Sequence, residues 1–279
     1  MSESTLYPPP RPLSVGEVLD LSFRIYRSTF AKCLVFGALA VVANWLPNLY
    51  SIARGQTVAQ SVLSPGADPG RAATVLIAGL LAALFPMAII LRQYRMITGG
   101  ETGGEFTRAL KLLGRMVLMG ILFLLAMLAC LLFLVPAFFA SGLARYALMA
   151  VLLLPVIYVF IRFMCCFTAM AVENTSAAGS LARSWELTGG NVLRLTAIDT
   201  VAVFLLIVLY AVVVSLTGFL YVVFGKTDVA LISAAVGVMV VAAGALASPY
   251  YSALGLAIFG DLTARKEGVD LARRITAEA

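Results

Sequence analysis

The sequence predicts an all-α integral membrane protein whose six transmembrane helices form three hairpins. Of its 279 residues, 62% are hydrophobic and only 12% are charged, whereas soluble domains are about half apolar and roughly a quarter charged. Six apolar stretches are also long enough to cross a bilayer core of about 30 Å as helices of roughly 20 residues. We place these spans at residues 31–50, 72–94, 116–138, 146–170, 192–223 and 229–259.

The distribution of basic residues predicts the orientation of these spans. Of the 20 Lys and Arg residues, 15 fall on the side that holds both termini, four fall on the other side, and Arg162 lies inside a span. Cytoplasmic loops of membrane proteins carry an excess of Lys and Arg. We therefore expect a multi-pass membrane protein with cytoplasmic N- and C-termini.

An amphipathic helix is predicted immediately before the first span. Ser14 is a good N-cap residue, and Glu17 follows three residues later, which is the spacing of a capping box. Apolar residues then recur at helical spacing along one face, with charged residues opposite. The apolar face consists of Val15, Leu19, Phe23, Tyr26 and Phe30.

Similar segments precede the third and fifth spans. Thr102 and Glu105 repeat the capping-box spacing, while in the third copy the pair Gly189–Gly190 interrupts the helix. The second span of each pair contains a proline. These recurrences predict three units, each an in-plane cytoplasmic helix followed by a transmembrane hairpin, although cytoplasmic loops of any six-span protein tend to be basic and amphipathic. The prolines are Pro86, Pro155 and Pro249.

The repeat sets the predicted domain boundaries. A Pro-rich cytoplasmic tail, residues 1–13, is expected to be disordered, and a charged cytoplasmic tail occupies residues 261–279. The six-span domain lies between them at residues 14–260. Its repeat units cover about 14–95, 102–171 and 176–260.

The basic faces of the in-plane helices are expected to contact phospholipid headgroups. Alternatively, the three helices gather beneath the bundle as a cytoplasmic docking surface. The residues proposed to contact headgroups are Arg24, Arg27, Lys32, Arg108, Lys111, Arg115, Arg183 and Arg194.

Two charged residues lie inside spans, Arg162 in the fourth and Asp199 in the fifth. Both are roughly 10–12 Å below the cytoplasmic interface at 1.5 Å rise per residue. Intramembrane charges usually face the interior and pair, so we predict an Arg162–Asp199 ion pair. It serves either as part of a substrate, ion or proton pathway or as a static link between the two spans.

Four polar or aromatic residues of the first and sixth spans are candidates for lining a cavity, although such residues also anchor spans at the interface. A run of small residues at 242–248 predicts close helix contact, either within the molecule or in a dimer. The four cavity candidates are Asn44, Trp45, Tyr250 and Tyr251.

The sequence argues against catalysis. It contains no histidine, which is the commonest general base and metal ligand. Its four cysteines lack the spacing of a metal site, and no glycine-rich loop has the form of a nucleotide fingerprint. We therefore expect no catalytic residues, no metal site, no cofactor and no nucleic-acid partner.

Three stretches carry a family resemblance: RPLSVGEVLDLSFRIYRSTF at Arg11–Phe30, SLARSWELTGGNVLRL at Ser180–Leu195, and FGDLTARKEGVDL at Phe259–Leu271. Together they resemble the bacterial glycerophosphoryl diester phosphodiesterase membrane-domain family, with Thr263 where that family often carries Arg. The resemblance implies a six-span domain of mostly unknown function, sometimes fused to a soluble phosphodiesterase barrel. That barrel uses histidines, which this chain lacks, so its activity is not carried over.

Together with this resemblance, these observations predict a non-enzymatic protein of the bacterial cytoplasmic (inner) membrane that acts as a scaffold, partner subunit or envelope-homeostasis factor. The alternative is a small-molecule or lipid transporter, or a lipid-binding protein, with an intramembrane cavity near Arg162 and Asp199. The expected partners are membrane lipids together with another membrane protein or a second copy of the chain.

Overall fold

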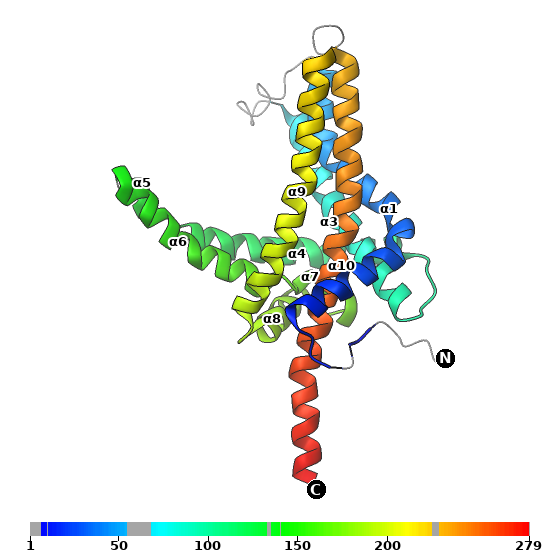
Figure 1. The fold of residues 1–279 in the computed structure, drawn as a ribbon, viewed down its shortest axis with the longest axis vertical. Coiled ribbons are helices and arrows are strands. Elements are labelled where there is room, and N and C mark those ends of the chain that lie inside the picture. Colours follow the sequence, from blue (N-terminus) through cyan, green and yellow to red (C-terminus); the bar gives the residue numbers. More distant parts are fainter. Residues whose placement is uncertain are drawn as a thin grey trace. The chain divides into compact units, whose positions relative to one another are not determined.

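The computed structural model consists of helices and short connections (Figure 1). It describes residues 7–9, 11–54, 68–132, 135–139, 141–224 and 229–278, and no strand occurs within these ranges. The all-α prediction is therefore confirmed for the described part of the chain. The helices are α1 (Val15–Ala53), α3 (Pro69–Ile97), α4 (Glu105–Leu132), α5 (Val135–Phe139), α6 (Gly142–Phe163), α7 (Cys166–Glu173), α8 (Ala177–Thr188), α9 (Val192–Phe224) and α10 (Val229–Glu278).

Among the described residues, six helical stretches are long and apolar enough to cross a membrane, as expected of a multi-pass protein. Each of them overlaps one predicted span. The stretches are Val15–Ser51, Pro69–Ile97, Glu105–Ala137, Gly142–Glu173, Val192–Val223 and Gly237–Gly268.

The segments predicted as in-plane helices differ in how they join their spans. The first two continue without a helix break into the following span, as parts of α1 and α4. The third is a separate helix, α8, which ends at Thr188 and is followed by Gly189 and by Gly190 with φ of +79°. The predicted interruption at Gly189–Gly190 is therefore confirmed. Glycine suits this position, because it adopts the left-handed conformation without steric cost.

The two predicted capping boxes have different outcomes. At the start of α1, the Glu17 N–H donates to Ser14 Oγ over 3.3 Å, and the Ser14 N–H donates to the Glu17 carboxylate over 2.7 Å, as predicted. The capping box predicted at Thr102 and Glu105 does not form. Such a box would place Glu105 at the third residue of the helix, whereas α4 begins at Glu105 itself. There the Glu105 carboxylate accepts the Gly103 N–H at 2.6 Å instead.

The fourth span is broken, in contrast to the continuous helix predicted at 146–170. Helix α6 ends at Phe163, Met164 and Cys165 form a turn, and α7 begins at Cys166. Arg162 therefore lies in the last turn of α6 rather than in the middle of a helix. A helix end leaves backbone groups that need partners elsewhere, and the site described below supplies them.

The chain divides into two compact units. Unit 1 comprises Met1–Leu21, Gly114–Asp199 and Leu254–Ala279, and unit 2 comprises Ser22–Leu113 and Thr200–Ala253. Because α1, α4, α9 and α10 each contribute residues to both, the units are formed by non-contiguous parts of the sequence.

Within unit 2, small residues bring α1 and α10 into close contact. A Cβ added to Gly37 would lie 2.7 Å from the Ala245 carbonyl oxygen, and one added to Gly244 would lie 2.2 Å from Cγ2 of Val41. Because Pro249 has no N–H, the Ala245 carbonyl that faces Gly37 lacks its usual helical donor four residues later. The small-residue run of α10 therefore serves as an internal packing face, one of the two interpretations that its sequence left open.

Polar contacts tie α3 to the other helices of unit 2. Gln93 is fully buried and donates to the Pro249 carbonyl at 2.8 Å and to Thr29 Oγ1 at 3.2 Å. Arg92 binds the carboxylate of Glu105, which is also buried, at 3.0 Å. Buried polar groups are stable when they are paired in this way, so these contacts fix the register of α3.

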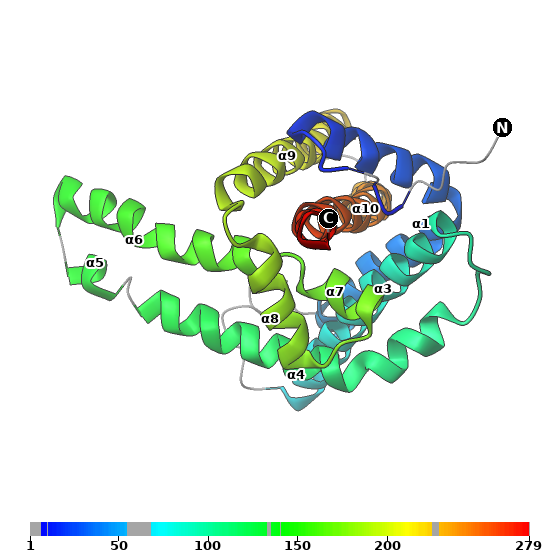
Figure 2. The ribbon, with the colours of Figure 1, turned by 90° about the horizontal axis from the view of Figure 1, so that it is seen from below.

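Within unit 1, the part of α4 that begins at Gly114 runs beside α6 (Figure 2). The Phe123 ring packs edge-on against Phe160 and Phe163, with centroid distances of 6.5 and 6.0 Å. Edge-to-face aromatic contacts of this kind add to the energy of apolar burial. These contacts therefore hold α4 against the end of α6.

Part of the tail that was expected to be disordered packs against α10 in unit 1. Tyr7 is 6% exposed, and a Cβ added to Gly260 would lie 2.6 Å from its ring and 3.0 Å from Cδ of Pro9. The charged tail predicted from residue 261 continues α10 as helix to Glu278. The described residues of both terminal segments are thus part of the folded protein.

We expect Gly37→Ala to destabilise the protein by about 1–3 kcal/mol, because the added methyl group overpacks a backbone contact between two helices. The free energy of unfolding, measured by titrating the detergent-solubilised protein with sodium dodecyl sulfate, checks this. Gly79→Ala in α3 is the matched control, since nothing lies within 4 Å of its added Cβ. Equal effects of the two substitutions would contradict close α1–α10 packing.

Candidate functional site

Arg162 is the centre of the candidate site in unit 1. The residue is 6% exposed, and its guanidinium lies 4.1 Å from the centroid of the Trp185 ring and 5.9 Å from that of Tyr158. A cation over an aromatic face is stabilised by the ring quadrupole. Its position in the last turn of α6 also places the positive charge at the negative end of the helix dipole.

Helix α8 supplies the polar partners for the end of α6. Ser184 Oγ donates to the Arg162 carbonyl at 2.8 Å, and Thr188 Oγ1 donates to the same carbonyl at 3.2 Å. Ser184 Oγ also accepts the Cys165 N–H at 3.2 Å. Residues four apart share one face of a helix, so both hydroxyls point at the break in the fourth span.

A second cation approaches Arg162 at the glycine turn that ends α8. The position that a Cβ of Gly189 would occupy is 3.1 Å from Arg162 Nη1 and 3.6 Å from Lys266 Nζ. Lys266 Nζ also donates to the Glu186 main-chain carbonyl. Helices α6 and α10 therefore bring two positive charges to one point beside the backbone of Gly189.

Arg183 forms an ion-pair hub close by. Its guanidinium contacts Glu173 at 3.0 Å, Glu186 at 3.5 Å and Glu267 at 2.6 Å. These carboxylates come from α7, α8 and α10. The hub therefore joins three helices and commits all three carboxylates to Arg183.

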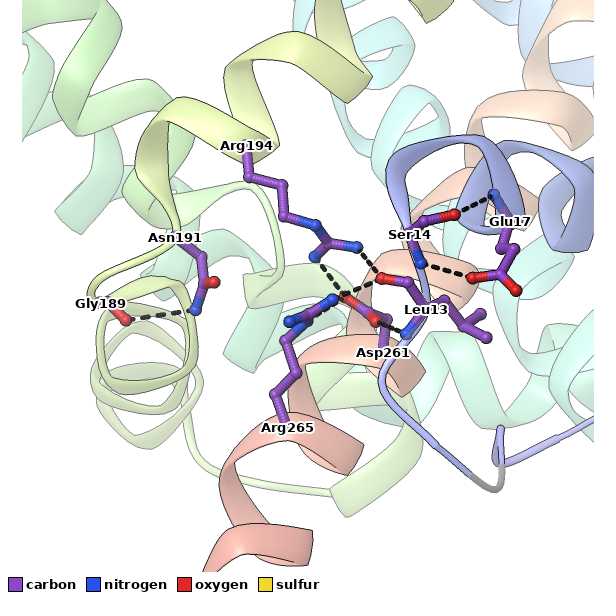
Figure 3. Close-up of polar contacts among 8 residues, drawn as sticks. All are labelled: Leu13, Ser14, Glu17, Gly189, Asn191, Arg194, Asp261 and Arg265. Carbon is purple, nitrogen blue, oxygen red and sulfur yellow. Dashed lines mark hydrogen bonds and ion pairs between the residues drawn. The ribbon is translucent and has the colours of Figure 1, made fainter.

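Asp261 is the centre of a second polar cluster, which consists of Leu13, Arg194, Asp261 and Arg265 (Figure 3). The Asp261 side chain is 1% exposed, accepts the Leu13 N–H at 2.7 Å, and binds Arg194 at 2.5 Å and Arg265 at 3.1 Å. Both arginines also donate to the Leu13 carbonyl. This Asp261 cluster ties the segment before α1 to α9 and α10.

The contacts described for the Arg162 side chain do not include the predicted partner Asp199. Nε of Arg162 is buried without a hydrogen-bond partner, and none of the ion pairs given above for the described residues includes Arg162. Asp199 is half-buried on α9 and makes a polar or electrostatic interaction of its own. Direct pairing of the two residues stays a prediction.

The eight residues proposed to contact headgroups fall into two groups. Three are used inside the molecule: Arg183 and Arg194 in the clusters above, and Arg115, which donates to the Asn174 side chain at 3.0 Å. The other five side chains are exposed and form no ion pair or hydrogen bond among the residues that the structure describes. These five are Arg24, Arg27, Lys32, Arg108 and Lys111.

None of the four residues proposed to line a cavity lines the open depression that the structure shows among residues 32 and 96–102. Tyr250 packs against the rings of Phe23 and Tyr26, with centroid distances of 5.1 and 5.8 Å, and Asn44 donates to the Ala40 carbonyl of its own helix at 2.9 Å. Trp45 is half-buried and Tyr251 is 39% exposed. An open depression of about 520 Å³ is instead lined by Lys32, Met96, Gly99, Gly100, Glu101 and Thr102.

Sequence reasoning missed the roles of Asp261, Lys266 and Glu105. A signal for Asp261 was present, because it stands four residues before Arg265 at the end of the last span, within the stretch that carries the family resemblance. The Leu13 partner gave no signal, because its main chain makes the contacts. Trp185 was assigned only to an apolar face, although its ring contacts a cation.

No family model, no curated protein and no solved structure matches the chain. The resemblance to the phosphodiesterase membrane-domain family therefore stays a prediction. The geometry of the clusters and spans carries the functional argument that follows.

We expect Asp261→Asn to lower the free energy of unfolding by about 3 kcal/mol, because it leaves two guanidiniums without their shared buried carboxylate. Hydrogen exchange at the Leu13 amide should also accelerate, since that N–H loses a charged acceptor. Mass spectrometry of exchanged peptides and an unfolding titration measure the two effects.

Glu267→Gln is the matched control on the same helix. Glu267 also binds an arginine, but its side chain is 60% exposed, so we expect a loss of only about 0–1 kcal/mol. A control loss as large as that of Asp261→Asn, or an unchanged exchange rate at Leu13, would show that the Asp261 cluster does not hold the N-terminal segment.

Proposed function

We propose that the chain is a non-enzymatic protein of the bacterial inner membrane that acts as a scaffold or partner subunit. In this proposal both termini are cytoplasmic, and the chain belongs to the family that its three motif stretches resemble. The spans form three hairpins related by an internal repeat, with basic in-plane segments at the headgroup level.

One observation carries the proposal, namely the unequal packing of the spans. Glu105–Ala137 and Val192–Val223 bury only 6% of their most apolar 18-residue windows, and Gly142–Glu173 buries 17%, whereas Pro69–Ile97 and Gly237–Gly268 each bury 44%. Helices of a membrane bundle gain stability from close packing with other helices. The weakly packed spans therefore have free faces on which another membrane protein can complete the bundle.

The charged residues of the site support a structural role as well. Glu105, Glu173, Glu267 and Asp261 all bind arginines within the protein. Within the described ranges, no group of three or more acidic, cysteine or histidine side chains is placed to hold a metal ion. These carboxylates thus serve to join helices, which suits a protein that presents surfaces to a partner.

Photo-crosslinking in native membranes tests the scaffold role. We expect p-benzoylphenylalanine at Leu124 of α4 and at Phe204 of α9, which are 65% and 61% exposed, to crosslink to protein. The same probe at Met119 of α4, which is 1% exposed, should give far fewer intermolecular products. Gel shifts and mass spectrometry of the products identify the partner or a second copy.

Crosslinks from Leu124 and Phe204 to lipid alone would contradict the scaffold role. They would favour the second candidate, a lipid-binding or transport protein. The observation that favours this second candidate is the buried guanidinium of Arg162, which lacks a carboxylate partner among the contacts described for it.

A further inference from the structure

We propose that Arg162 and Lys266, beside the backbone of Gly189, bind a phosphate group. The phosphate belongs to a phospholipid headgroup or to a soluble phosphate compound. This site is independent of the scaffold role, because it lies at the glycine turn after α8 and does not use the exposed faces of α4 and α9.

The first argument is the state of the Arg162 guanidinium. The residue is 6% exposed and its Nε is buried without a hydrogen-bond partner. Trp185 covers one face of the guanidinium, but a ring face does not accept the in-plane N–H groups along the edge of the fork. A buried cation is destabilising unless an anion and hydrogen-bond acceptors satisfy it.

The second argument is the approach of Lys266. Arg162 Nη1 and Lys266 Nζ both lie within 3.6 Å of the same point beside Gly189. Two like charges at such spacing repel each other, and an anion between them turns that repulsion into attraction. A guanidinium fork with an adjacent ammonium is a donor set suited to the several oxygens of a phosphate.

The third argument is that the described carboxylates of α7, α8 and α10 are committed elsewhere. Glu173, Glu186 and Glu267 bind Arg183, while Asp261 binds Arg194 and Arg265. The two cations at Gly189 therefore have no acidic side chain from α7, α8 or the described part of α10 to neutralise them.

The absence of a side chain at residue 189 lets the backbone lie close to both cations. A Cβ at residue 189 would stand 3.1 Å from Arg162 Nη1, closer than ordinary van der Waals contact, and 3.6 Å from Lys266 Nζ. Gly190 adopts φ of +79°, which lets the chain turn directly into α9. The backbone can therefore pass close to the cations without a side chain blocking their donors.

The position in the fold favours phosphate over other anions. Arg162 lies in the last turn of α6, and Lys266 lies near the end of the last apolar stretch, Gly237–Gly268. Basic pockets between transmembrane helices at the membrane surface bind the head groups of anionic lipids. The internal competitor is Asp199, which would fill the site if it paired with Arg162.

Trp185 provides a direct reporter of binding, since its ring contacts Arg162. The chain has two tryptophans, so a Trp45→Phe variant leaves Trp185 as the only emitter. This variant, purified in dodecyl maltoside, is titrated with dioleoyl phosphatidylglycerol and separately with inorganic phosphate. Dioleoylglycerol, which has the same acyl chains without phosphate, is the ligand control.

We expect a saturable change in Trp185 emission with a phosphate-bearing ligand and none with dioleoylglycerol. Saturation by phosphatidylglycerol without competition from inorganic phosphate assigns a lipid, and saturation by inorganic phosphate assigns a soluble compound. Either result supports the phosphate site.

Lys266→Gln is the decisive variant, because Lys266 is half-buried and, among the described residues, its side chain donates only to a main-chain carbonyl. We expect at least tenfold weaker binding, as the loss of a charge-assisted hydrogen bond predicts. Arg162→Gln should abolish the response, with circular dichroism confirming that it folds. Lys111→Gln, at an exposed lysine of α4, should leave the binding curve unchanged.

Three outcomes would overturn the site. The first is the absence of a saturable response to either ligand. The second is unchanged binding in Lys266→Gln. The third is binding that appears only in Asp199→Asn, which would show that Asp199 fills the site as the counterion of Arg162.

Discussion

The hydroxyl of Ser184 joins two helices at the point where the fourth span ends, and much of unit 1 depends on this contact. It donates to the Arg162 carbonyl and accepts the Cys165 N–H. Because these are the backbone groups that a helix end leaves unpaired, the contact stabilises the break and sets the direction of α8. That direction places Trp185 over Arg162 and Gly189 beside its guanidinium.

The arginines and lysines of the chain perform two distinct tasks. Arg183, Arg194 and Arg265 bind carboxylates and link helices, so their charges are largely neutralised within the protein. Other basic side chains, such as Arg24 and Lys111, are exposed without a described partner. The sequence bias that predicts orientation therefore counts both kinds of residue together, although only the second kind remains available to headgroups.

The spans and their start and stop signals were predictable because they arise from local chemistry. Hydropathy located all six spans, and the Ser14–Glu17 capping box and the Gly189–Gly190 stop are short-range patterns. The break at Met164 was not predictable, since the apolar run continues through it and the groups that stabilise it lie on α8. Two of the three partners of Asp261, Arg194 and Leu13, stand 67 and 248 residues away in the sequence, where periodicity carries no information.

The Asp261 cluster recognises the main chain of Leu13 through both its N–H and its carbonyl. Such recognition is indifferent to the side chain, so most replacements at this position leave the contact intact. Chain length is what matters, because deleting one residue between Leu13 and the start of α1 would move the carbonyl away from both guanidiniums. The cluster therefore constrains the number of residues between Leu13 and the first helix. Substitution scanning would overlook this constraint, and variants with inserted or deleted residues would reveal it.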